Sequence, residues 1–224
     1  MRALVLVSGG LDSGVLLAYC KETYPDDYLL ALSFAYPSRH NYRESDAAEN
    51  LCKHYNVSRF VVDVSGLLNL VRGKTALLVG GMSPNELDKS YPPAGTIASF
   101  VPGRNLIFIA AASMVAIKYD CDKLFVGYQS GDCPNYPDCS PDFINAMKKA
   151  VNLTADGKLE LDAPFIGLSK CQVVKVGADL KFPFELSWSC YKDYPTHCGV
   201  CAACRERKKA FLEAGISDPT TYSD

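Results

Sequence analysis

An apolar run that ends at two glycines lies near the start of this chain and limits its fold more than any other segment. Residues 3 to 7 are all apolar, residues 8 to 10 read Ser-Gly-Gly, and apolar residues resume at Val15. A short apolar run that ends at glycines predicts a strand buried on both faces. The resumed pattern, with Asp12 or Ser13 as its cap, predicts the start of a helix. A strand, a glycine turn and a helix N-terminus in this order bind phosphate, because free backbone N–H groups and the helix dipole point at the anion.

The chemistry of this turn indicates one kind of phosphate loop. A Walker A loop ends in Gly-Lys-Ser/Thr, and residues 3 to 17 contain no lysine. The sequence Ser-Gly-Gly-x-Asp-Ser at residues 8 to 13 resembles instead the PP-loop of the N-type ATP pyrophosphatases. The resemblance implies that the loop holds the β- and γ-phosphates of ATP, with Mg2+, while the α-phosphate is attacked. A turn without a ligand is the alternative. The PP-loop residues expected to bind ATP are Val7, Ser8, Gly9, Gly10, Leu11, Asp12, Ser13 and Gly14.

Composition excludes several classes of protein. The chain has 224 residues, of which 48% are apolar, and a formal net charge of −2. This size and apolar content suit one globular domain over residues 1–224. The charge provides no basic field, so we expect no tight nucleic-acid binding, and no run of 18 apolar residues predicts a membrane span. Because the first strand begins at once, we expect no signal peptide and a cytoplasmic protein.

Apolar runs alternate with amphipathic stretches along the chain, which predicts βαβ units. The predicted strands are residues 3–7, 28–34, 59–64 and 123–128. The predicted helices are residues 13–23, 41–55, 65–70, 104–119, 141–151, 169–180 and 202–214. Residues 72–100, rich in Gly, Pro and Ser, predict a long mobile loop, and residues 129–141 predict a second loop. The predicted fold class is α/β, a parallel Rossmann-like sheet with helices on both faces, and the segments that follow its strands meet at one edge.

Ten cysteines without an export signal predict reduced thiols or metal ligands. Four form the pattern C-x7-C-x2-C-x2-C, and four thiolates at this spacing can surround one tetrahedral zinc ion. An iron–sulfur cluster is the main alternative, but Arg205 follows the last cysteine where ferredoxin patterns have proline. We therefore predict a structural zinc knuckle within residues 188–210, anchored by Trp188. Its expected ligands are Cys190, Cys198, Cys201 and Cys204. The remaining cysteines are interpreted as buried thiols: Cys20, Cys52, Cys121, Cys133, Cys139 and Cys171.

Two cations stand at predicted helix starts, where the helix dipole disfavours positive charge unless an anion is bound nearby. Arg104 follows a Val-Pro-Gly turn, and Lys170 follows Gly-Leu-Ser. We interpret both as anion contacts, with Lys170 neutralising departing pyrophosphate, and exposed surface cations are the alternative. His40 follows the second strand and can act as an acid or base, although a packing role is commoner. His54 and His197 are interpreted as surface residues.

Four motifs occur in order along the chain: the PP-loop, Val-Pro-Gly-Arg-Asn from residue 101, Tyr-Pro-Asp-Cys from residue 136, and the cysteine knuckle. Together they resemble the 7-cyano-7-deazaguanine synthase (QueC) family over nearly the whole length. The resemblance implies an ATP-dependent ligase of queuosine biosynthesis. Such an enzyme converts 7-carboxy-7-deazaguanine and ammonia to 7-cyano-7-deazaguanine (preQ0) through adenylated intermediates. It also implies one zinc ion at the terminal cysteines, and we expect a homodimer.

The expected site residues follow from these motifs. The residues expected to act in catalysis are Asp12, Ser13, Arg104 and Lys170. A planar deazaguanine that carries a carboxylate needs a stacking surface, a hydrogen-bonding edge and a cation. We expect Asp138 to accept hydrogen bonds from the N–H edge of the base, and Arg104 or Arg39 to contact the carboxylate. The expected substrate contacts are Tyr36, Arg39, His40, Arg104, Asn105, Tyr136 and Asp138.

The chain departs from the family pattern at three places, all on the substrate side. Pro37-Ser38 stands where the family has Gly-Gln, Ser140 stands where it has arginine, and Asp-Cys-Pro from residue 132 replaces Asp-Tyr/Phe-Ser. These departures keep a second interpretation open, a relative from antiphage defence that attaches a deazaguanine to a protein N-terminus. Two further alternatives are a PP-loop tRNA thiolase, disfavoured by the absent basic surface, and a non-catalytic zinc-dependent binding module, disfavoured by the intact PP-loop.

Overall fold

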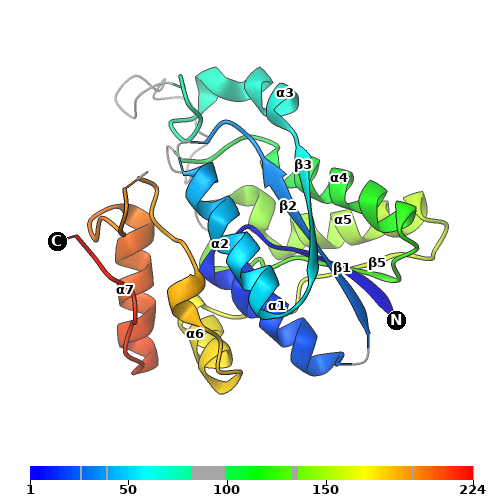
Figure 1. The fold of residues 1–224 in the computed structure, drawn as a ribbon. Coiled ribbons are helices and arrows are strands. Elements are labelled where there is room, and N and C mark those ends of the chain that lie inside the picture. The colour runs from blue at the N-terminus through cyan, green and yellow to red at the C-terminus, as the bar shows by residue number, and fades with distance from the viewer. Residues whose placement is uncertain (26, 39, 82–98, 133–135, 193, 224) are drawn as a thin grey trace.

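A computed structural model describes residues 1–25, 27–38, 40–81, 99–132, 136–192 and 194–223. In this part of the chain, five strands form one sheet in the order β3-β2-β1-β4-β5, and every neighbouring pair is parallel (Figure 1). The strands are β1 (Arg2–Leu6), β2 (Tyr28–Ala35), β3 (Ser58–Asp63), β4 (Lys123–Phe125) and β5 (Glu160–Asp162). β1 lies at the centre, where Val5 pairs with Ala31 on one side and Phe125 on the other. The predicted parallel α/β sheet is confirmed.

The sequence prediction misses β5 and extends β4 too far. β5 has only three residues, and Leu161 alone is buried between two charged neighbours, so no periodic pattern indicates the strand. β4 ends at Phe125 rather than at residue 128. A Cβ at Gly127 would lie 3.3 Å from the carbonyl oxygen of Asp12, so the chain passes closely over the start of the first helix as it leaves the sheet.

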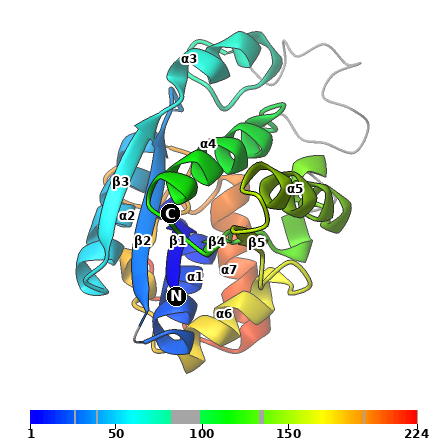
Figure 2. The same ribbon diagram turned by 90° about the vertical axis from the view of Figure 1, so that its right-hand side faces the viewer.

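Helices cover both faces of the sheet, as predicted (Figure 2). One face packs against α1 (Leu11–Thr23), α2 (Asn41–His54), α6 (Lys170–Asp179) and α7 (Ala202–Ala214). The other face packs against α4 (Arg104–Lys118) and α5 (Pro141–Thr154). The fully buried side chains of both layers are mostly Val, Leu, Ile, Phe and Ala, whose removal from water drives the assembly.

The first helix begins earlier than predicted. α1 starts at Leu11 with Gly10 as its N-cap, and no side chain caps it. The predicted cap by Asp12 or Ser13 is therefore wrong, because both residues lie inside the first helical turn. The N–H groups that begin a helix have no partner within it, so a helix that starts on glycine leaves them open to a ligand.

Short helical turns occupy several predicted loops. α3 (Ser65–Leu68) continues into the 3-10 turn η1 (Asn69–Lys74), so the predicted short helix is longer than expected. Leu77 and Leu78 of the predicted long loop are buried in a small cluster with Tyr36. Residues 82–98 of that loop lie outside the described residues, so its predicted mobility is not tested. The remaining 3-10 turns are η2 (Ser130–Asp132), η3 (Pro137–Cys139) and η4 (Phe184–Leu186).

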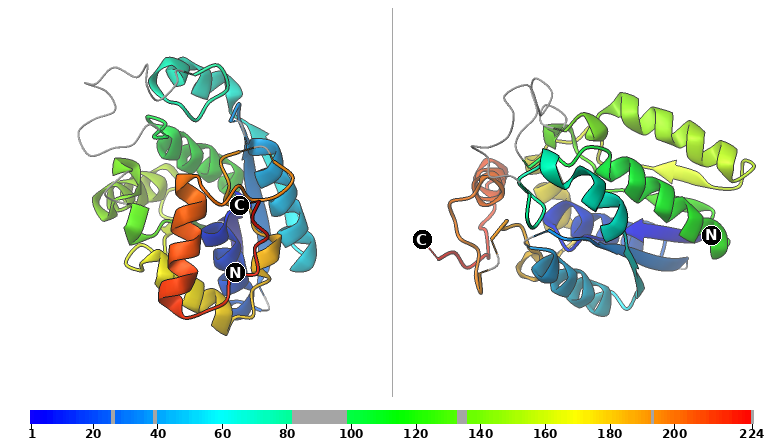
Figure 3. Two further views of the ribbon diagram at one scale, coloured as in Figure 1. Left: turned by 90° about the vertical axis from the view of Figure 1, so that its left-hand side faces the viewer. Right: turned by 90° about the horizontal axis from the view of Figure 1, so that it is seen from above.

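The cysteine knuckle lies at the carboxyl edge of the sheet, close to the PP-loop (Figures 1 and 3). The backbone N–H of Trp188 donates to the carbonyl of Gly9 at 2.8 Å, which joins the two segments directly. Among the described helices, none is long and apolar enough to cross a membrane.

Candidate active site and metal centre

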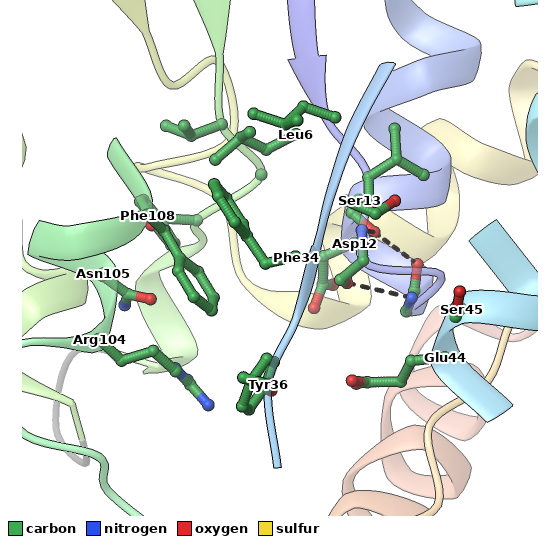
Figure 4. Close-up of a pocket in the computed structure, with 18 of the residues that line it drawn as sticks. Leu6, Asp12, Ser13, Phe34, Tyr36, Glu44, Ser45, Arg104, Asn105 and Phe108 are labelled. Atoms are coloured by element: carbon green, nitrogen blue, oxygen red, sulfur yellow. Dashed lines mark hydrogen bonds between the residues drawn. The ribbon is translucent and has the colours of Figure 1, made fainter. Parts of the chain in front are cut away.

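Two serine hydroxyls of the PP-loop hold its turn open. Ser13 Oγ accepts a hydrogen bond from Ser8 N at 3.1 Å and lies 3.0 Å from Ser8 Oγ. Ser8 Oγ in turn accepts from Gly10 N at 3.2 Å (Figure 4). The N–H groups that these hydroxyls accept from belong to Ser8 and Gly10, which precede α1, so the N–H groups that begin the helix stay open to an anion such as phosphate.

Gly9 fixes the position of the PP-loop against the rest of the molecule. Its φ is +90°, and a Cβ there would lie 2.1 Å from the carbonyl oxygen of Glu44, so only glycine fits. The loop therefore lies directly against the first turn of α2 on one side and against Trp188 on the other.

Asp12 and Lys170 form an ion pair at the mouth of the loop. Lys170 Nζ donates to Asp12 Oδ2 at 3.0 Å, and both side chains are mostly buried. α6 begins at Lys170, where a capping box of Ser169 and Gln172 fixes its start. Asp12 Oδ1 is buried and makes no hydrogen bond within the described part of the chain. A carboxylate oxygen left open beside a phosphate loop fits a cation that prefers oxygen ligands, such as Mg2+.

Two adjoining cavities form the cleft in front of the PP-loop. The first cavity has an apolar wall that includes Leu6, Phe34 and Phe108, and the two phenyl rings stack at 4.3 Å. The second cavity is polar, and its own lining includes His40, Ser99, Tyr136, Lys170 and Tyr191. The residues that line both are Ser8, Gly10, Asp12, Tyr36, Glu44, Arg104, Asn105 and Tyr128. The PP-loop thus lies at the junction of an apolar and a polar compartment.

Arg104 begins α4, as predicted, and its guanidinium points toward Tyr36 (Figure 4). Burial lowers the pKa of Arg104, but Tyr36 and Asp138 raise it above its usual value, so the side chain stays positively charged. Burial and the neighbouring Glu44 raise the pKa of Tyr36 to about 12, so its phenol stays neutral. The pair offers one fixed cation and one hydroxyl to a negatively charged ligand.

Asp138 stabilises the start of helix α4 through hydrogen bonds with Asn105. Its Oδ2 accepts from the backbone N–H of Asn105 at 3.2 Å, and its carbonyl accepts from Asn105 Nδ2 at 3.2 Å. Burial raises the pKa of this carboxyl. Asp138 Oδ2 already accepts a hydrogen bond at the start of α4. The expected hydrogen bond from the N–H edge of the deazaguanine stays a prediction, and it would use Asp138 Oδ1.

Tyrosines and a serine line the far side of the second cavity. The hydroxyl of Tyr136 lies 3.0 Å from Ser99 Oγ and 3.5 Å from the hydroxyl of Tyr191. Tyr136 thus lines the second cavity, and its expected contact with the substrate stays a prediction. Arg39 and Cys133 lie outside the described residues, so their expected roles are not tested.

Glu44 lies in the cleft, and the sequence analysis missed it. It stands one helical turn after His40 on α2, and His40 Nε2 lies 3.5 Å from Glu44 Oε1. Burial raises the pKa of Glu44 to about 7, although Arg104 opposes the shift. Burial and Arg104 lower the pKa of His40 to about 4, so this histidine is neutral at physiological pH. The only signal in the sequence was the i, i+4 spacing of the two residues, which places them on the same helical face.

Two of the departures from the family pattern, Pro37 and Ser140, have local structural roles, and the third includes residues 133 and 134, which lie outside the described residues. The carbonyl of Pro37 accepts a hydrogen bond from Val79 N at 2.6 Å, and this contact does not need the backbone N–H that proline lacks. Ser140 is the N-cap of α5, and its Oγ accepts from Phe143 N at 3.2 Å. An arginine at this position would supply charge but would lose the cap.

The four predicted ligand cysteines come together at one point. The sulfur atoms of Cys190, Cys198, Cys201 and Cys204 all lie within 4.8 Å of one another. Four thiolates around one zinc ion stand about 3.8 Å apart at the usual Zn–S distance of about 2.3 Å. The N–H groups of Lys192 and Cys201 donate to the sulfurs of Cys190 and Cys198, both at 3.3 Å, which stabilises thiolates. The donor set therefore fits a tetrahedral metal ion.

Aromatic side chains tie this cluster to the protein. Trp188 Nε1 donates to the carbonyl of Cys190 at 2.8 Å, as an anchor for the knuckle should. The ring of His197 packs 4.3 Å from Trp188, and its Nε2 accepts from Ser189 N at 3.0 Å. The prediction of a surface position is thus wrong for His197, which fills the space between two aromatic rings, and correct for the exposed His54.

The other cysteines follow their predicted burial with one exception. Cys171 is half-buried rather than buried, like its neighbours Ser169 and Lys170 at the start of α6. The remaining described thiols are all buried: Cys20, Cys52, Cys121 and Cys139.

The parallel sheet, the glycine loop before α1 and the metal-binding knuckle define a PP-loop α/β protein. Solved structures with this fold include the U34-tRNA thiolase NcsA from Methanococcus maripaludis with its [4Fe-4S] cluster. The match has a TM-score of 0.55 at 16% identity, and it covers 95% of this chain and 65% of the thiolase. NMN synthetase from Francisella tularensis matches with a TM-score of 0.53 at 15% identity over 96% of this chain and 77% of the synthetase. Likeness at this level of identity shows the fold alone.

Within that class, the chain belongs to the QueC family. The family model described as queuosine biosynthesis protein QueC matches residues 2–215. The 7-cyano-7-deazaguanine synthase of Thermoplasma volcanium is 40% identical to this chain, over 99% of it and 91% of the relative. The enzyme of the same name from Caldicellulosiruptor saccharolyticus is 36% identical over 99% of this chain and 96% of the relative. The expected family membership is confirmed.

Proposed function

We propose that this protein is an ATP-dependent ligase that converts 7-carboxy-7-deazaguanine and ammonia to 7-cyano-7-deazaguanine. The observation that carries the proposal is the junction between the two cavities, where the PP-loop, the Asp12–Lys170 ion pair and Arg104 face one another. Membership of the QueC family and relatives named 7-cyano-7-deazaguanine synthase support it.

The reaction needs two activations of the same carbon. A carboxylate is a poor electrophile because its leaving group would be oxide. Attack of a carboxylate oxygen on the α-phosphorus of ATP releases pyrophosphate and forms an acyl-adenylate, from which ammonia displaces AMP to give the amide. The amide oxygen then attacks a second ATP, and loss of AMP leaves the nitrile. The contribution of the protein is positioning and charge stabilisation.

The first cavity is the proposed nucleotide side of the cleft. The PP-loop N–H groups and the hydroxyl of Ser13 bind the β- and γ-phosphates, and the apolar wall around Phe34 and Phe108 packs against the adenosine. Lys170 neutralises the pyrophosphate as it leaves. The open oxygen of Asp12 holds Mg2+ on the phosphates, and this ion supplies charge neutralisation when bound.

The second cavity is the proposed acceptor side. The charge of Arg104 pairs with the carboxylate of the deazaguanine and directs it toward the α-phosphate. Tyr36 and Tyr136 supply aromatic surface and hydroxyl groups to the planar ring. His40 and Asn105 line the same space. The four cysteines hold a structural zinc ion that orders the knuckle at the edge of this cavity.

One assay tests the proposal. The protein is incubated with ATP, Mg2+, ammonia and 7-carboxy-7-deazaguanine, and the products are identified by mass spectrometry. We expect the mass of the amide to appear first and that of the nitrile to follow. A deazaguanine adduct on protein, without free nitrile, would overturn the proposal in favour of a protein-modifying relative.

A further inference from the structure

The proposed reaction removes protons from one nitrogen three times, and the inference below rests on that proposed function. Ammonia carries three N–H bonds, the amide carries two, and the nitrile carries none. One proton leaves as C–N bond formation expels the first AMP. Two more leave as the adenylated amide becomes the nitrile, when the N–H electron pairs form C–N π bonds and the C–O electron pair departs with the second AMP. A proton acceptor at the junction of the cavities must therefore be used repeatedly.

Glu44 occupies that position. It lines both cavities, and its carboxylate points into the cleft toward Tyr36, with Arg104 on the other side of that ring (Figure 4). The side chain is 20% exposed, so a ligand in the cleft can reach it while bulk water is largely excluded. The backbone carbonyl of Glu44 lies directly against Gly9, so this turn of α2 lies beside the PP-loop, where the proposed reaction brings the α-phosphate and the acyl carbon together.

The titratable and charged groups around Glu44 come from five parts of the chain. His40, the N-cap of α2, lies 3.5 Å away, Tyr36, which follows β2, and Arg104 of α4 face it across the cleft, and the Asp12–Lys170 pair closes the side toward α1 and α6. Arg104 and Lys170 are cations and Tyr36 is a neutral phenol, so none of the three accepts a proton at neutral pH. The candidates that remain in the described part of the cleft are Glu44, His40, Asp12 and Glu206, and of the two glutamates only Glu44 lines both cavities.

Asp12 and His40 are poorly suited to the task. Asp12 is committed to Lys170 through Oδ2 and lies on the phosphate side. His40 is 3% exposed and deeply buried behind Glu44, and its lowered pKa makes it a weak base. Its Nε2 lies 3.5 Å from Glu44 Oε1, so a neutral imidazole that carries its proton on Nε2 faces the carboxylate with that proton.

We infer that Glu44 is the general base that takes protons from the attacking ammonia and then from the amide nitrogen, and that His40 is a positioning residue that orients the Glu44 carboxylate. Each proton passes from nitrogen to a carboxylate oxygen of Glu44 and is released to water before the next one arrives. A group that must bind and release protons at neutral pH works best with a pKa near 7, and burial provides this for Glu44.

The test separates the steps that need a base from the step that does not. Formation of the acyl-adenylate uses a carboxylate that is already ionised, so exchange of labelled pyrophosphate into ATP, with 7-carboxy-7-deazaguanine and without ammonia, needs no base. We expect E44Q to keep this exchange within a few-fold of the wild-type rate while amide formation falls about 10²- to 10⁴-fold. Glu49→Gln is the matched control, because Glu49 is an exposed glutamate on the same helix, and it should leave both rates unchanged.

The pH profile of amide formation identifies the base. In the wild type, kcat/KM calculated for unprotonated ammonia should fall as the pH drops below about 7, because Glu44 becomes protonated. This limb of the pH profile should be absent in E44Q. H40N should lower the rate and keep that limb, because Glu44 remains. Amide formation by E44Q at the wild-type rate, or a limb that disappears in H40N and persists in E44Q, would overturn the inference. Absence of pyrophosphate exchange in the wild type would overturn the proposed function itself.

Thermal unfolding gives a readout that does not depend on activity. The folded-state pKa of Glu44, about 7, lies above that of an unfolded glutamate, so folding takes up a proton between the two values. The contribution of Glu44 to stability therefore falls as pH rises from about 4.5 to about 7, while the lowered pKa of His40 acts in the opposite direction, so the unfolding temperature of the wild type relative to that of E44Q should fall over this range. Identical pH dependence of the unfolding temperature in both proteins would show that Glu44 is not held in the environment that the inference requires.

Discussion

On the proposed nucleotide side of the cleft, one continuous turn of eight residues is expected to supply the phosphate contacts, and its two serine hydroxyls lie within hydrogen-bonding distance of each other. The acceptor side is assembled from separate segments, which bring His40 and Glu44 from α2, Arg104 from α4, Tyr136 from the loop before α5, and Tyr191 from the knuckle. A contiguous site forms whenever its turn forms. An assembled site depends on each segment that supports it, so the two sides should respond differently to the same kinds of change.

The cysteine knuckle contacts both sides but supports them unequally. On the nucleotide side it makes one backbone hydrogen bond, from Trp188 to Gly9. On the acceptor side it carries Tyr191, which packs against the His40 ring at 5.4 Å and approaches the hydroxyl of Tyr136. The metal site is thus part of the architecture of the acceptor side.

Loss of a metal ligand should have the largest effect. Cys201→Ser removes one thiolate, and structural zinc sites contribute apparent binding energies of about 10–16 kcal/mol to folding. We expect the purified variant to carry less than one zinc ion per chain and to be poorly soluble, as measured by elemental analysis and yield. Cys171→Ser is the control, because Cys171 lies outside the cluster and is only half-buried. A Cys201→Ser protein with full metal content would contradict the four-cysteine site.

Loss of Asp12 should be the next largest effect, and it acts on the contiguous side. Asp12→Asn keeps the shape of the side chain but removes the charge that pairs with Lys170 and faces the phosphates. We expect kcat to fall about 10²- to 10³-fold, with the thermal unfolding temperature little changed. Exposed Asp142 offers a control at the start of α5, where Asp142→Asn should leave turnover intact. Equal loss in the two variants would mean that the effect of Asp12 is not specific to the site.

Arg104 tests the assembled side separately. Arg104→Gln removes the cation that is proposed to pair with the acceptor carboxylate, and a charge-assisted contact contributes about 1.5–3 kcal/mol, or about ten- to a hundredfold in affinity. We expect KM for 7-carboxy-7-deazaguanine to rise by that factor in steady-state assays, while KM for ATP changes little. Arg72→Gln, on the exposed η1, should change neither. A rise in KM for ATP alone would place Arg104 on the nucleotide side and break the comparison.

The smallest effect is expected at Ser140, where a family departure is explained by local structure. Ser140→Ala loses the hydrogen bond to Phe143 N at the start of α5, and loss of such a cap costs about 1 kcal/mol of unfolding free energy. We expect that decrease in urea denaturation, with KM for the acceptor unchanged. Ser140→Gly should cost less, because glycine is tolerated at this position of a helix. A large rise in KM in Ser140→Ala would mean that Ser140 contacts the acceptor.

The same difference between contiguous and assembled sites explains how far the sequence could be interpreted. The PP-loop and the four-cysteine cluster each lie in one short stretch of sequence, and the strands of the parallel sheet are short apolar runs. The sequence therefore predicts all three features. Glu44 was missed because its importance arises from the approach of α2 to Gly9 and from burial against Arg104, which no local pattern records. His197 was misplaced because the rings of Trp188, nearby in the sequence, and of Tyr222, close to the C-terminus, pack against it, and no periodic pattern records those contacts.

β5 is an element of the fold that the sequence does not predict. Its three residues have no periodicity of their own, and their strand geometry comes from pairing with β4, where Leu124 pairs with Leu161. The start of α1 was placed too late for a related reason. The expected caps, Asp12 and Ser13, point instead toward Lys170 and Ser8, which are contacts that serve the site rather than the helix.

The ratio of AMP to nitrile formed in a complete reaction tests the central claim most directly. The protein is incubated with limiting 7-carboxy-7-deazaguanine, excess ATP and ammonia, and the nucleotides and deazaguanine products are quantified by chromatography. Activation of the carboxylate and then of the amide predicts two molecules of AMP and two of pyrophosphate for each nitrile. Formation of ADP, or of nitrile with a single AMP, would contradict the assignment of the PP-loop as the site where the α-phosphate is attacked twice.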